Sequence, residues 1–300
     1  MTLHNPACST SQEWASQLDN IFARCEGAYS DLTLSGYRKD LQIFAAWCEK
    51  NDGDFLPADP HSVAEFFNEQ LLFFSYATIR RRASAIRFAH VLSDLPSPIK
   101  HSEVFLATRR AARLKGRRPK QSLGLTQELL SKILASCPDT LSGKRDAALL
   151  SVGYDTLCRS SELTWMRIED INMEQSRLHI PRAKSDPFGD GRFREINHST
   201  RRLLQDWLSA SRITEGPVFR GLHTGSISNS RLDTSSIRRI VKTAALRAGL
   251  KDEALRLSGH SMRVGGAQDL FRAGEQYLTI MIAGGWKSIE VVRRYVENAP

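Results

Sequence analysis

The chain has 300 residues, of which 41% are hydrophobic and 25% are charged, a composition typical of soluble globular proteins. Its longest apolar run, residues 147–157, is too short to span a bilayer, and the chain does not open with a basic and then apolar leader. Five scattered cysteines and eight histidines form neither a CxxC nor an HxxxH pair, which argues against a disulfide framework and a zinc site. We therefore expect a cytoplasmic protein with no metal and no cofactor.

The formal net charge is +9, and lysine and arginine gather in two clusters, residues 80–87 and 109–120. The second cluster carries seven basic residues and no acid. Both clusters fall on predicted helices and neither is balanced by acids. We therefore favour phosphate binding over solvated helix faces, and we expect double-stranded DNA as the partner. The candidate DNA-binding residues are Arg80, Arg81, Arg82, Arg87, Arg109, Arg110, Arg113, Arg117, Arg118, Lys120, Arg238 and Lys242.

The first part of the chain predicts a flexible tail at residues 1–10 and a helical DNA-binding domain at residues 11–116. Apolar residues recur there at helical spacing. Four helices are predicted at 32–48, from Asp59 through 67, from Ser75 or Thr78 to Leu92, and from Ser102 into the basic cluster. On the third helix, Arg80, Arg81 and Arg87 fall mostly away from the apolar stripe, where they can face a DNA groove.

Residues 117–125 form the predicted linker, because the stretch GRRPKQSLG contains two glycines, a proline and three basic residues. Residues 126–300 predict a second domain in which one small antiparallel hairpin interrupts the helices. The strands of the hairpin are expected at 177–180 and 192–196, with turn residues at 186–191 and Lys184 at the tip. Helices are expected from Thr126, and at 146–157, 200–210, 235–248, 260–273 and 288–296. The predicted fold class is mainly α with a small antiparallel β element.

Five polar side chains stand in the order Arg159, Lys184, His260, Arg263 and Tyr295. Exchange of a phosphodiester requires a hydroxyl to approach an anion and the leaving alkoxide to be protonated, so catalysis depends on positioning and charge stabilisation. Guanidinium forks can supply that charge without a metal. A phenol, whose pKa is about 10, needs such cations and a base to attack at neutral pH. Taken alone, Tyr295 could equally be an aromatic residue packed on a C-terminal helix.

The motifs around these residues resemble those of the tyrosine recombinase, or phage integrase, family. The matching segments are LCRSSEL at 157–163, Lys184 in the hairpin, SGHSMRVGGA at 258–267 and AGGWKSIEVVRRYV at 283–296. The resemblance covers residues 30–296 and implies a two-domain clamp around DNA, with a helical core-binding domain and an α+β catalytic domain. It also implies a homotetramer on DNA with inverted-repeat half-sites. Such an enzyme recombines DNA through a 3′-phosphotyrosyl intermediate and a Holliday junction, without metal or ATP.

The resemblance further implies a role for each residue of the predicted catalytic set. Tyr295 is the nucleophile. Arg159 binds a non-bridging oxygen of the scissile phosphate and Arg263 is the second arginine of the site. His260 assists the phenol together with these arginines. Because His260 and Arg263 are three residues apart on one predicted helix, we expect them to face the same way.

Three further residues complete the set. Lys184 protonates the 5′-hydroxyl leaving group, with Lys287 as a weaker rival for that role. Glu162 orients either His260 or Arg159. Trp286, nine residues before the tyrosine, packs against the site and donates a hydrogen bond to the phosphate.

Two other functions remain open at this level. A non-catalytic DNA-binding protein with a decayed site would carry the same basic helices, although it has no use for Tyr295 or Lys184. A relaxing topoisomerase of related chemistry would match the motifs less well. Only residues 296–300 follow the tyrosine, where members of the family usually carry a further docking helix. Either the chain is truncated or its protomers assemble through other surfaces.

Overall fold

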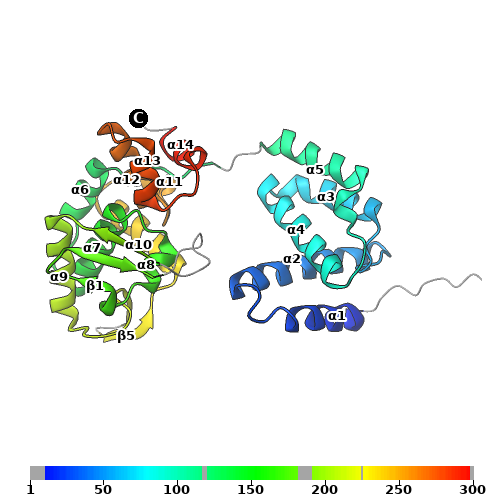
Figure 1. Cartoon of the computed structure of the whole chain (residues 1–300), viewed down its shortest axis with the longest axis horizontal. Helices are drawn as coiled ribbons and strands as arrows, with labels where there is room; N and C mark the ends of the chain where they lie inside the picture. Colours follow the sequence, from blue (N-terminus) through cyan, green and yellow to red (C-terminus); the bar gives the residue numbers. More distant parts are fainter. Residues whose placement is uncertain (1–10, 117–119, 182–190, 224–225, 298–300) are drawn as a thin grey trace, which may run out of the picture. The chain divides into compact units, whose positions relative to one another are not determined.

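The computed structural model describes residues 11–116, 120–181, 191–223 and 226–297, and the chain divides into two compact units, Met1–Lys120 and Gln121–Pro300. The first unit consists of helices, and the second combines helices with two small antiparallel sheets (Figure 1). The predicted fold class is thereby confirmed. In the described ranges, no helix has the length and apolar character that crossing a bilayer requires.

The helices of the first unit pack around an aromatic core. They are α1 (Ser11–Ala23), α2 (Asp31–Lys50), α3 (Pro60–Phe73), α4 (Tyr76–Leu92) and α5 (Ser102–Lys115), with the short 3-10 helix η1 (Pro98–Lys100) before α5. Phe44, Phe66 and Ile79 are fully buried where α2, α3 and α4 meet. Of the two caps expected for α4, Ser75 is the one used, because its hydroxyl accepts a hydrogen bond from the Thr78 N–H at 3.3 Å.

A buried ion cluster joins α2 to α4. The carboxylate of Asp40 on α2 accepts hydrogen bonds from Nε and Nη2 of Arg81 on α4 at 2.6 and 2.8 Å. Arg82 is only 3% exposed, with its Nε 3.7 Å from the same carboxylate and its guanidinium 4.3 Å over the Phe74 ring. The arginines at 80–87 are therefore balanced by an acid after all, and the assignment of Arg82 to DNA binding is wrong. Arg82 can be buried because the Asp40 carboxylate and aromatic rings replace the hydration that its guanidinium loses.

The second unit begins with residues 121–125 and contains most of the short elements. In chain order its elements are α6 (Gln127–Ala135), α7 (Leu141–Asp155), α8 (Ser160–Trp165), η2 (Ile168–Asp170), β1 (Ile171–Asn172), β2 (Arg177–Ile180), β3 (Arg192–Glu195), α9 (His198–Ser211), β4 (Arg220–His223), β5 (Ser226–Arg231), α10 (Thr234–Arg247), α11 (Lys251–Arg256), α12 (Ser261–Arg272), α13 (Tyr277–Gly284) and α14 (Ile289–Val296). β1, β2 and β3 form one antiparallel sheet, and β4 and β5 form another. The β4–β5 hairpin, α11 and α13 go beyond the prediction, because elements of this length carry little periodicity.

α7 runs through the core of the second unit. Leu149, Leu150 and Val152 on this helix are fully buried. α7 begins at Leu141, five residues before the predicted start, because Thr140 caps it by accepting the Gly143 N–H at 3.2 Å. The buried Trp207 of α9 belongs to the same core, and α9 packs along α7.

Residues 121–125, expected as the end of the linker, lie against the start of α12, and we call them the docked segment. The Leu123 N–H donates to the Arg256 carbonyl at 3.1 Å, and the Leu125 N–H donates to the Ser261 carbonyl at 2.8 Å. Gly265 on α12 permits this approach, because a Cβ there would lie 1.9 Å from the Leu125 carbonyl oxygen. The motif SGHSMRVGG is thus partly a packing motif for the chain that enters the second unit.

We predict that Asp40→Ala lowers the free energy of unfolding of the first unit by about 3 kcal/mol or more, because Arg82 stays buried and loses its counter-charge. Urea denaturation followed by circular dichroism measures the change. The matched control is Asp19→Ala, which removes a surface ion pair with Arg38 whose side chains are 39% (Arg38) and 70% (Asp19) exposed. That change should cost less than about 1 kcal/mol. Equal losses from the two variants would contradict a stabilising role for the buried cluster.

Candidate active site

Tyr295 stands on α14, which a glycine turn directs back to the core. α13 ends at Gly284, and Gly285 adopts φ +63°, in the left-handed region that favours glycine. Trp286 then packs so closely on Gly284 that a Cβ at that glycine would lie 1.9 Å from the indole ring. The AGGW motif therefore folds as a helix end. It places the Trp286 ring 4.7 Å from the Tyr295 ring, centroid to centroid.

The phenol of Tyr295 is paired with His260. The Nε2 atom of His260 lies 2.5 Å from the phenol oxygen, and the His260 backbone N–H donates to Ser258 Oγ at 3.1 Å. α12 begins at Ser261, so His260 is the N-cap residue and not, as predicted, the first residue of the helix. It still faces the same way as Arg263, whose guanidinium carbon lies 5.8 Å from the centre of the Tyr295 ring.

Arg263 is fully buried behind the two aromatic rings. Its Nη2 donates to the Gly284 carbonyl at 2.7 Å and its Nη1 donates to the Leu157 carbonyl, while its guanidinium carbon lies 4.1 Å over the Trp286 ring. In the described part of the chain, Nε of Arg263 and the indole N–H of Trp286 are buried without a hydrogen-bond partner. Burial, and then the charge of Arg159, lower the pKa of Arg263 to about 10, so the guanidinium remains charged at neutral pH.

Burial also decides the protonation state of His260. Burial first, and then the charges of Arg263 and Arg159, lower its pKa to about 4. The imidazole is therefore neutral at pH 7. A neutral ring that lies within hydrogen-bond distance of a phenol can accept the phenol's proton.

Glu162 holds two arginines at the edge of this cluster. Its buried carboxylate accepts hydrogen bonds from Arg159 Nη1 at 2.6 Å and from Arg192 Nη2 at 2.7 Å. It also accepts the backbone N–H of Arg159 at 2.9 Å, at the start of α8. Burial acts to raise the pKa of Glu162, but Arg192 and Arg159 outweigh it and keep that pKa below its usual range. Of the two partners expected for Glu162, His260 and Arg159, it bonds Arg159.

Arg192 lies outside the predicted set, although it packs into the site. It begins β3, its side chain is 13% exposed, and its Nη1 would lie 2.6 Å from a Cβ at Gly285. It thus fills the space between Glu162 and the glycine turn before Trp286. The clue in the sequence is the strand RFRE, in which alternate residues share a face. Nothing in the sequence indicates that this face meets Glu162.

The predicted leaving-group residue, Lys184, lies outside the described residues, as do Arg117 and Arg118. Lys287, its rival, is exposed between Trp286 and α14. The remaining predicted DNA-binding residues that are exposed are Arg80, Arg81, Arg87, Arg109, Arg110, Arg113, Lys120 and Arg238. Lys242 is half-buried, and its Nζ donates to the Leu255 carbonyl at 3.3 Å.

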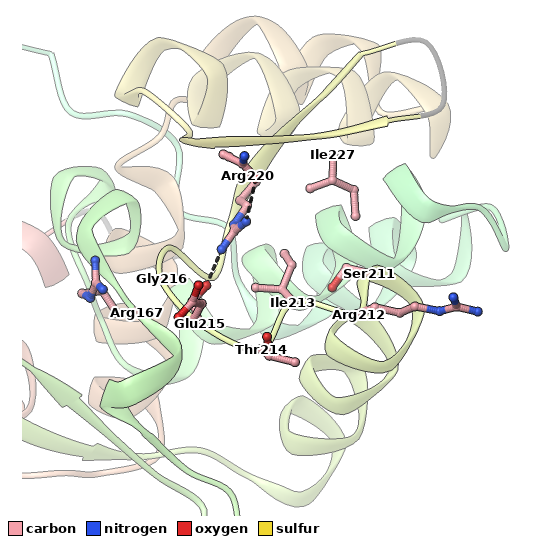
Figure 2. A pocket seen from close by; sticks show the side chains of 10 residues that line it. Arg167, Ser211, Arg212, Ile213, Thr214, Glu215, Gly216, Arg220 and Ile227 are labelled. Carbon is pink, nitrogen blue, oxygen red and sulfur yellow. Dashed lines mark hydrogen bonds between the residues drawn. The ribbon is translucent and has the colours of Figure 1, made fainter.

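A hollow of about 630 Å³ lies apart from this cluster, beside the end of α9 and the β4–β5 hairpin (Figure 2). Arg167, Arg212 and Arg220 are among its lining residues. The guanidinium of Arg220 donates from Nε to the Pro217 carbonyl at 2.9 Å and also to the Glu215 carbonyl. This arginine therefore holds the loop together. None of the clustered residues lines this hollow, and we do not assign the reaction to it.

Comparison with known proteins agrees with the fold. The model of the "Phage integrase family" matches residues 124–300, and that of the "Phage integrase, N-terminal SAM-like domain" matches residues 22–91. The protein is therefore a tyrosine recombinase, an enzyme that cleaves and joins DNA strands. The chain belongs to the phage integrase family.

Individual relatives cover nearly the whole chain. The recombinase Cre of Escherichia phage P1 is 29% identical over 98% of this chain and 91% of its own length. The motifs SGHSMRVGG and AGGW of this chain resemble those of Cre. An integrase/recombinase XerD homolog of Selenomonas ruminantium is 32% identical over 92% of this chain and 84% of its own. XerH recombinase, solved bound to its palindromic difH substrate, has the same fold, with a TM-score of 0.66 at 20% identity over 94% of this chain and 80% of its own.

We predict that His260 in the DNA-free protein titrates near pH 4, the value set by its burial and by Arg263 and Arg159. Proton NMR of the imidazole gives the midpoint, and His260→Gln assigns the signal. In the unfolded chain the pKa of His260 is about 6.5, which is higher than its pKa in the folded protein. The contribution of His260 to stability is therefore fully present above about pH 6.5 and is lost as the pH falls toward 4. A midpoint of 6.5 or above would contradict the neutral buried imidazole.

Proposed function

We propose that this protein is a site-specific recombinase in which the Tyr295 phenol attacks the scissile phosphate of DNA. The observation that carries the proposal is the 2.5 Å contact between His260 Nε2 and the phenol oxygen, beside a buried and charged Arg263. A phenol surrounded in this way has a base for its proton and a cation for the charge that develops on its oxygen.

In the proposed first step, the Tyr295 oxygen forms a bond to phosphorus while the bond from phosphorus to the 5′ oxygen breaks. His260 accepts the phenol proton, and Lys184 supplies a proton to the 5′-hydroxyl that leaves. The product is a 3′-phosphotyrosyl linkage. Since this linkage replaces one phosphodiester by another, a 5′-hydroxyl from a second strand can reverse the reaction and seal the junction without ATP.

The two arginines of the predicted set meet the phosphate differently. The side chain of Arg159 is 23% exposed and oriented by Glu162, so a phosphate oxygen can reach its guanidinium. Arg263 has no exposure in the DNA-free protein and lies behind the rings of Tyr295 and Trp286. Its contact with phosphate therefore requires the phenol to shift when DNA binds. The unpartnered indole N–H of Trp286 becomes available through the same movement.

We further propose that the basic side chains of the first unit bind the DNA backbone. Arg80 and Arg87 are exposed and two turns apart on one face of α4, and Arg109, Arg110 and Arg113 are exposed on α5. Inverted-repeat half-sites are supported by the palindromic substrate in the XerH complex. Exchange of one strand pair at a time then requires a homotetramer and a Holliday junction. The reaction takes place on DNA in the cytoplasm.

We predict that Tyr295→Phe binds target DNA with unchanged affinity and forms no covalent adduct, because the ring is kept and the nucleophilic oxygen is lost. A nicked suicide substrate, from which the short cleaved end diffuses away, traps the adduct for denaturing electrophoresis. The wild-type protein run in parallel is the control. An adduct on the phenylalanine variant would exclude Tyr295 as the nucleophile, and relaxation of plasmids of any sequence would favour a topoisomerase.

We predict that replacing Arg80 and Arg87 together by Ala weakens DNA binding and lowers the slope of log affinity against log salt by about 2, one for each lost phosphate contact. Affinities measured by fluorescence anisotropy between low and physiological salt give the slope. The thermal melting of the variant should match the wild type, because both side chains are exposed. An unchanged slope would mean that α4 does not face the DNA.

A further inference from the structure

The docked segment contacts both partners of the pair formed by His260 and Tyr295, on the side away from the phenol. The Nε2 of Gln121 donates a hydrogen bond to the Tyr295 backbone carbonyl at 3.0 Å. The next residue, Ser122, shares a hydrogen bond with Ser258 between their Oγ atoms at 2.7 Å. Ser258 Oγ in turn accepts the His260 backbone N–H at 3.1 Å. Two consecutive residues thus connect to the nucleophile and to its base.

The Tyr295 carbonyl is held from a second direction as well. Gln268 on α12 is 3% exposed, and its Nε2 donates to the same oxygen at 3.2 Å. The Oε1 of Gln268 lies against Gly124 of the docked segment, where a Cβ would be only 2.1 Å away. Tyr295 belongs to the last turn of α14, whose carbonyls lack partners within the helix. The two glutamine amides supply partners for the carbonyl of Tyr295.

We propose that Gln121 is a positioning residue for Tyr295, and that the docked segment sets the distance between the phenol and the imidazole. The proposal rests on Tyr295 acting as the nucleophile. α14 is a helix of only eight residues, anchored in the core by Val292 and Val296. A shift of its last turn therefore moves the phenol directly. Because the reacting groups must lie within a few tenths of an ångström of their productive positions, such a shift reduces the rate without reducing DNA affinity.

The docked segment lies where the chain enters the second unit. Residue 121 is the first residue of the second unit, and the chain that leads from the first unit arrives there. A force on the linker therefore acts first on Gln121 and Ser122, and through them on the Tyr295 carbonyl and on Ser258.

The test is the single-turnover rate of adduct formation by the full-length protein on the nicked suicide substrate. Gln121→Leu keeps the size of the side chain and removes the amide, and it should slow adduct formation about tenfold with the DNA Kd changed less than about twofold. The matched control is Gln127→Leu, the same change at an exposed glutamine whose amide contacts Ser131 at 3.3 Å. This control should react at the wild-type rate.

A second substrate separates positioning of the nucleophile from other defects. In a 5′-bridging phosphorothiolate, the sulfur leaves without needing a proton, so a defect in protonation of the leaving group disappears with this substrate. A displaced phenol stays displaced, and Gln121→Leu should remain about tenfold slow on this substrate too. A wild-type rate on either substrate, or an equal loss in Gln127→Leu, would overturn the inference. If the wild-type protein itself formed no adduct, the proposed function would fail, and the inference with it.

Discussion

The hydrogen bond between His260 and Tyr295 is the contact on which the arrangement of the candidate active site depends. It requires an imidazole that stays neutral and a phenol that stays close to a positive charge. Buried Arg263 contributes to both, since its charge helps to depress the His260 pKa and it lies beneath the Tyr295 ring. The glycine turn, the docked segment and the carbonyls of Leu157 and Gly284 each hold one member of this group in place.

Two buried arginines show how the same side chain serves different ends. Arg82 lies 3.7 Å from the carboxylate of Asp40, so its charge is compensated and it joins two helices. Arg263 hydrogen-bonds to carbonyl oxygens, and in the described residues no carboxylate lies within ion-pair distance of it. A buried charge without a direct ion-pair partner is costly to desolvate. Such a cost is consistent with the proposed function, in which Arg263 contacts a phosphate of DNA.

The resemblance to the tyrosine recombinase motifs predicted the set that includes His260, Arg263, Trp286 and Tyr295, and the structure brings these four side chains together. The sequence also predicted β2 to the residue. It could not predict that Arg82 faces Asp40, since the partners are about forty positions apart and burial depends on how α2 and α4 meet. Arg192 was not predicted for the same reason. Its place in the site depends on a contact with Glu162, which lies on another element. Local patterns indicate elements, and long-range pairs follow only from packing.

The close contact of Gly265 with the Leu125 carbonyl has a practical consequence for protein engineering. The contact would constrain a hybrid enzyme made by joining the first unit of one protein to the second unit of another. In such a hybrid, residues 121–125 must be kept together with α12, since they fit against its Gly265 and Gln268. A fusion point before Gln121 keeps that fit, whereas one between Gln121 and Leu125 would place foreign residues against α12, behind the candidate site.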